Sequence, residues 1–97
     1  MTTKTDVHIP TIRELCDGRL IGKRVFHEEK LPYHEVSGIV QKLFIAGDNV
    51  ILVAGWDRGD PFSPSVGLDA LIRVGRDGRI TVRDRLPYGG NEWTFTV

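Results

Sequence analysis

Two apolar runs on either side of a short turn constrain the fold more than any other feature of the sequence. Residues 43–45 and 50–53 are apolar at successive positions, and Gly-Asp-Asn at residues 47–49 separates them. Because successive side chains of a strand point to opposite faces, such runs are typical of strands covered on both faces. They predict the centre of a sheet or of a tightly curled barrel, with strands at residues 36–46 and 50–56.

Shorter extended segments complete the predicted sheet. We expect further strands at residues 20–26, 68–75, 79–84 and 92–97, a charged loop at residues 27–30 and an irregular stretch at residues 57–67. In the last strand, Trp93, Phe95 and Val97 alternate with polar residues, which is typical of a half-buried strand. Five to six strands without βαβ alternation predict an all-β fold (or α+β if one short helix is counted), either a small SH3-like barrel or a strongly curled antiparallel roll.

The apolar side chains predict the register of the hairpin near Gly78. A two-residue loop would place Val74 opposite Thr81 and mix apolar with polar side chains on one face. A three-residue loop at residues 76–78 instead pairs Val74 with Ile80. We therefore expect the longer loop, with Gly78 in the left-handed conformation.

The N-terminal part of the chain contains a helix-start motif. In Thr11-Ile-Arg-Glu14, the threonine can cap the backbone and the glutamate can reach back, as in a capping box. The motif predicts one short helix at residues 12–17. We expect residues 1–8 to form a flexible tail and residues 9–97 to form a single domain, a size that supports one core.

Composition narrows the classes of function. Thirteen basic residues balance thirteen acidic ones, whereas nucleic-acid binders usually have a basic excess. The single cysteine, Cys16, excludes an internal disulfide and favours a cytoplasmic location. The first residues have no apolar segment typical of a secretory signal, and no apolar run approaches the roughly 20 residues that span a bilayer.

The most promising binding segment is Trp56-Asp-Arg-Gly-Asp-Pro-Phe62. An irregular loop beside aromatic residues is where binding sites tend to lie on a β scaffold. Trp56 and Phe62 would form an apolar platform, with acidic and basic residues between them to orient a polar ligand. Alternatively, Phe62 folds back to plug an open barrel end. The candidate ligand-binding residues are Trp56, Asp57, Arg58, Asp60, Phe62, Tyr33 and His34.

A second group combines histidines with carboxylates. His27 is followed by two glutamates, and His34 precedes Glu35. No HExxH spacing is present, and His34 and Glu35, as neighbours on a strand, would point to opposite faces. We therefore interpret this group as a solvated charged loop. We expect no metal site and no cofactor.

These observations favour a non-enzymatic binding module that uses the aromatic loop. One alternative is a small enzyme with His34 and a carboxylate in a pocket at a subunit interface. Another is a nucleic-acid-binding module that uses arginines of the second half, among them Arg73 and Arg83. We also expect a homodimer that forms through residues 92–97 as an unguarded edge strand.

Overall fold

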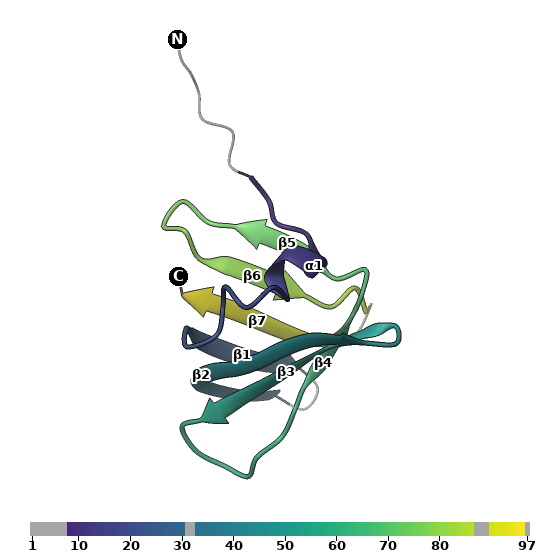
Figure 1. The fold of residues 1–97 in the computed structure, drawn as a ribbon. Coiled ribbons are helices and arrows are strands. Elements are labelled where there is room, and N and C mark those ends of the chain that lie inside the picture. The colour runs from purple at the N-terminus through teal and green to yellow at the C-terminus, as the bar shows by residue number, and fades with distance from the viewer. Residues whose placement is uncertain (1–7, 31–32, 87–89, 97) are drawn as a thin grey trace.

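The computed structural model describes residues 8–30, 33–86 and 90–96, and it shows one antiparallel sheet with a single short helix (Figure 1). The elements in chain order are α1 (Ile12–Leu15), β1 (Arg24–Lys30), β2 (Tyr33–Ala46), β3 (Asn49–Trp56), β4 (Ser65–Gly67), β5 (Leu71–Val74), β6 (Ile80–Arg83) and β7 (Asn91–Thr96). The strands follow the order β4-β3-β2-β1-β7-β6-β5. The sheet is not closed, so the all-β prediction is confirmed in the form of a curled antiparallel roll. In the described ranges, no helix has the length and apolarity needed to cross a membrane.

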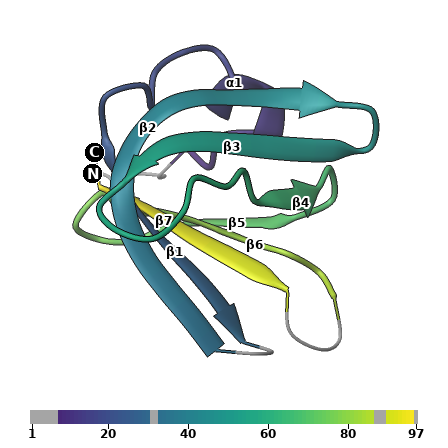
Figure 2. The ribbon, with the colours of Figure 1, turned by 90° about the horizontal axis from the view of Figure 1, so that it is seen from below.

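The curl of the sheet comes mainly from the long strand β2. Its pairing with β3 shifts register between Val40 and Lys42, an irregularity that increases local bending. Figure 2 shows β2 arching so that β3 and β4 lie across from β5, β6 and β7. The apolar side chains of the inner face are therefore buried between the two halves of one sheet.

The core lies on this concave face. Val25, Val40, Leu52, Val82, Trp93 and Phe95 are almost completely buried there. Leu15 of α1 and Leu20 of the following turn join the same cluster. Isolated helices as short as α1 are unstable in water, so its packing against the core holds it in place.

Several local predictions are confirmed. Thr11 and Glu14 form the capping box, although the α-helix ends at Leu15. In the β5–β6 hairpin, Val74 pairs with Ile80, and Gly78 has φ of 88°. Trp93 and Phe95 are fully buried, whereas Val97 lies outside the described residues.

Other segment boundaries were wrong. The strand expected at residues 20–26 begins only at Arg24. Residues 27–30 are not a loop, because they extend β1 between β2 and β7. Within the stretch expected to be irregular, residues 65–67 form β4, so the sheet has seven strands instead of five to six. Three residues around one valine are too short to give an alternating pattern.

The C-terminal strand is not an edge strand. β7 pairs with β1 on one side and with β6 on the other. The edges belong to β4 and β5, the terminal strands of the order. Both sides of β7 are thus paired within the chain, so this strand does not offer the unpaired edge that the predicted dimer contact needs, and Val97 lies outside the described residues.

Candidate ligand site on the concave face

The alternation of β1 brings a histidine and a carboxylate to the inner face of the sheet. Val25 is buried on that face, so His27 and Glu29 follow on the same side at intervals of two residues. On the neighbouring strand β2, His34 lies directly opposite Glu29. The three side chains therefore gather on the concave face, near the ends of β1 and β2 that meet at residues 30 and 33.

His27 is the most unusual member of the group. Its side chain is 0% exposed, and neither ring nitrogen has a hydrogen-bond partner among the described residues. Leaving a buried polar group unpaired costs about 1–3 kcal/mol. Burial lowers the pKa of His27, and the nearby carboxylate of Glu29 opposes this only in part. The imidazole is therefore neutral at neutral pH.

Two aromatic side chains, those of Trp56 and Phe62, line one side of the site. The rings of Trp56 and Phe62 are stacked, with centroids 4.9 Å apart and planes inclined by 20°. The Trp56 Nε1–H donates a hydrogen bond of 2.9 Å to the carbonyl oxygen of Phe62, which fixes the loop back onto the strand. The Phe62 ring centroid lies 5.2 Å from that of His27 and 5.7 Å from that of His34.

Glu29 links the two histidines. Its Oε2 lies 3.9 Å from Nε2 of His27, and its Oε1 lies 3.6 Å from Nδ1 of His34. One potential ligand atom from each of the three residues lies within 4.8 Å of the others. The side chains of Glu29 and His34 are 39% and 49% exposed, so the group has a buried end at His27 and an end open to water.

A second buried polar atom lies on the adjacent strand. Trp93 of β7 pairs directly with His27 of β1. Its Nε1 is also buried without a hydrogen-bond partner in the described part of the chain. Paired residues of antiparallel strands have neighbouring side chains. Two unsatisfied polar groups thus occupy adjacent positions of the concave face.

The predicted site residues are only partly brought together. Trp56, Phe62 and His34 meet around His27, as described. Phe62 does so by folding back, which was the alternative to an open platform. Arg58 and Asp60 lie exposed in the loop.

Asp57 and Tyr33 lie apart from this cluster. Asp57 forms an ion pair of 2.8 Å with Arg24, whose position on β1 faces outward. The Tyr33 hydroxyl donates a hydrogen bond to Glu35, and this contact raises the pKa of Tyr33 to about 12. Because Tyr33 is adjacent to His34 on β2, its side chain belongs to the opposite face of the sheet.

Sequence reasoning missed His27 and Glu29 as members of the site. The indication was present, since a His-x-Glu spacing places both side chains on one face of a strand. It was overlooked because three successive charged residues after His27 favoured a solvated loop. Tertiary pairing on both sides of β1 overrides that local preference.

The arginine group does not form a continuous basic face. Arg73 pairs with Thr81 across the hairpin, whereas Arg83 lies opposite Glu92 of β7. Arg79 forms an ion pair of 3.3 Å with Asp77. Arg73 and Arg83 thus share the outer face of the hairpin with Glu92, so an acidic side chain lies among the basic ones there.

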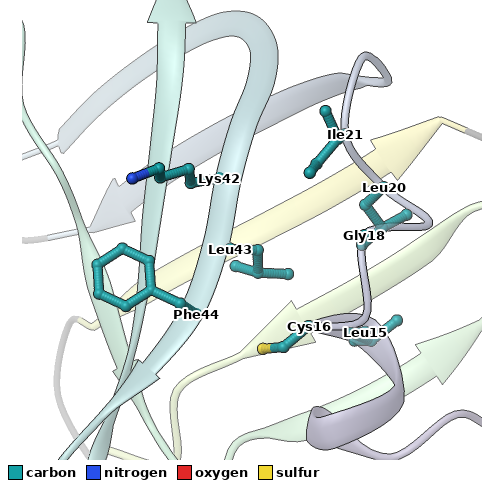
Figure 3. Close-up of a pocket in the computed structure, with 8 residues that line it drawn as sticks. All are labelled: Leu15, Cys16, Gly18, Leu20, Ile21, Lys42, Leu43 and Phe44. Atoms are coloured by element: carbon teal, nitrogen blue, oxygen red, sulfur yellow. The ribbon is translucent and has the colours of Figure 1, made fainter.

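An apolar hollow lies elsewhere, between the α1 turn and β2. Its volume is about 270 Å³, and Leu15, Cys16, Ile21, Leu43 and Phe44 contribute to its lining (Figure 3). Burial raises the pKa of the Cys16 thiol, with a smaller contribution from Asp17. The hollow is separate in sequence and lining from the histidine site.

Searches against protein-family models, curated proteins and solved structures each found no match.

Proposed function

We propose that the protein is a small, non-enzymatic binding module that holds its ligand on the concave face, against His27, Trp56 and Phe62. His34 and Glu29 form the entrance, where the group is open to water. In this proposal, the aromatic loop serves as a wall of the site and not as an open platform.

The observation that carries the proposal is the unsatisfied, fully buried imidazole of His27. An apolar side chain would fill this position without an unpaired polar group. A histidine in the core therefore lowers the stability of the fold. Buried polar groups in folded proteins nearly always have a hydrogen-bond partner, and a bound ion or water is one of the explanations for an exception. The adjacent Nε1–H of Trp93 adds a second donor of the same kind.

A thermal-unfolding screen over divalent metal salts and small polar metabolites tests the proposal. A ligand that binds only the folded state raises the midpoint temperature in a concentration-dependent manner. We expect at least one such compound. Trp56→Ala should weaken its binding, while Arg73→Ala and Arg83→Ala should leave its affinity unchanged. Unchanged binding by Trp56→Ala, together with loss of binding by either arginine variant, would contradict the proposed site.

The single cysteine supports a reducing, cytoplasmic environment. Self-association as a homodimer also remains part of the proposal, with β4 or β5 as the edge available for pairing. Sedimentation equilibrium at micromolar concentration tests it, and a monomer mass would contradict it.

A further inference from the structure

We infer that the ligand of this site is a divalent transition-metal ion, coordinated by His27, Glu29 and His34. The inference rests on the proposed binding function and names its ligand class. It reverses the expectation of no metal, which depended on treating residues 27–30 as a loop. Imidazole nitrogens and a carboxylate oxygen form a ligand set typical of zinc and related ions.

Two independent features support a metal. The first is the convergence of three ligand types from two paired strands on one face. The second is the orphaned Nε2 of His27, which is buried and lies nearest to the Glu29 carboxylate. A neutral imidazole is the form that binds metal, and coordination would satisfy this nitrogen without requiring a hydrogen-bond donor.

The distances fit an open site that tightens on binding. Bonds of about 2.0–2.2 Å to zinc in tetrahedral geometry imply ligand atoms about 3.3–3.5 Å apart. The shortest distances from Glu29 run from different oxygens, 3.9 Å from Oε2 to Nε2 of His27 and 3.6 Å from Oε1 to Nδ1 of His34, so a single oxygen that binds the ion has to move closer to both nitrogens. All three ligand atoms already lie within 4.8 Å of one another, and rotation of the exposed His34 and Glu29 side chains can close the remaining gap.

The surroundings suit a binding site with an open coordination position. Phe62 and Trp56 lie on the His27 side, where they exclude water and support the imidazole ring. Apolar walls of this kind control solvent access to a metal. Three protein ligands leave a fourth position for water, and the exposed side of His34 and Glu29 provides the entry path.

Metal titration of untagged protein, treated with chelator and then dialysed, tests the inference directly. We expect calorimetry with Zn²⁺ to give one ion per chain. Co²⁺ should give visible absorption bands typical of bound cobalt. Since outer-sphere partners alone are worth about 10–100-fold in metal affinity, loss of a ligand in His34→Ala or Glu29→Gln should weaken Zn²⁺ binding by more than about tenfold.

Two variants serve as matched controls. Glu35→Gln removes a carboxylate adjacent to His34 but on the opposite face of β2. His8→Ala removes a histidine that contacts a glutamate, Glu14, at 3.1 Å on the surface. Both should bind Zn²⁺ as the unmodified protein does. Circular dichroism of every variant confirms that it is folded.

The outcomes separate this inference from the proposed function. The inference of a metal ligand is overturned if neither Zn²⁺ nor Co²⁺ binds. It is also overturned if His34→Ala and Glu29→Gln leave metal binding unchanged. If a metabolite still stabilises the protein and Trp56→Ala weakens that effect, the binding function stands with another ligand. If neither metals nor metabolites bind, both the inference and the proposed function fail.

Discussion

Among single residues, His27 combines close apolar packing with unpaired polar atoms. Its ring packs against Phe62 and Trp56, so its apolar contacts resemble those of a core side chain. Its nitrogens, by contrast, have no partner among the described residues. A well-packed residue with unpaired nitrogens lowers stability, and in the proposed function a ligand would offset that loss.

Replacing this imidazole by an apolar side chain should therefore not destabilise the metal-free protein. We expect His27→Leu to keep or raise the free energy of unfolding, by about 1 kcal/mol, because an unpaired buried polar group disappears. Urea denaturation in the presence of a chelator measures this change. A loss of more than about 1 kcal/mol would instead indicate that His27 has a structural hydrogen bond, for example to buried water.

Cys16 provides a pH-dependent prediction at the same scale. Burial raises its pKa, so at a given pH a smaller fraction of the thiol is ionised in the folded protein than in the unfolded chain. Because the thiolate is the reactive form, alkylation of the native protein should be slower, and its rate should rise at a higher pH than in urea. Rates with iodoacetamide between pH 7 and 10 test this. A lower midpoint in the native protein would contradict it.

At the scale of elements, local chemistry was enough to predict the hairpin and the helix start. The pairing of Val74 with Ile80 followed from matching apolar faces, and the positive φ of Gly78 from the loop length. The capping box at Thr11 is likewise a contact between near neighbours. Such features depend on a few adjacent residues, which is why the sequence alone predicts them.

The ends of strands and the site were harder to predict for the same reason. Whether residues 27–30 form a loop or a strand depends on their pairing with β2 and β7, and β7 is distant in sequence. The candidate site was hard to predict for the same reason, because it depends on strand pairing between distant segments. Trp56, Phe62 and His34 were recognised as aromatic or ionisable residues, but His27 and Glu29 needed the extended conformation to share a face.

Gly38 lets β2 approach β3 closely beside Trp56. A Cβ at this position of β2 would lie 2.6 Å from the carbonyl oxygen of Gly55 and 2.9 Å from Cε3 of Trp56. Because the first contact is with backbone, Gly38→Ala should force the strands apart and lower the free energy of unfolding by about 1–3 kcal/mol. Chemical denaturation measures this loss.

Gly55→Ala on β3 is the matched control for that substitution. Its Cβ would meet only the side chain of Gln41, at 3.0 Å from Nε2, and this flexible side chain can move away. The control should therefore lose clearly less stability than Gly38→Ala. Equal losses would mean that glycine in these strands matters for its backbone and not for the space it leaves to Trp56.

In the molecule as a whole, the last strand pairs with the first in the interior of the open sheet. β7 lies between β1 and β6, although the β1 segment precedes it by more than half of the chain. The burial of Trp93 and Phe95 was predictable from alternation, but the partner strands were not, because no local pattern specifies them. Placing residues 92–97 at an edge was the resulting error.

This strand order predicts how protection against hydrogen exchange is distributed. Amides of β1 and β7 lie in strands paired on both sides, close to the most buried side chains, such as Val25 and Phe95. Their exchange should require global unfolding, whereas β4 and β5 can open at the edges with smaller free-energy cost. Exchange measured by NMR at low protein concentration should therefore be slowest in β1 and β7. Exchange of β7 as fast as that of β5 would contradict the central position of the C-terminal strand, on which the burial of His27 beside Trp93 depends.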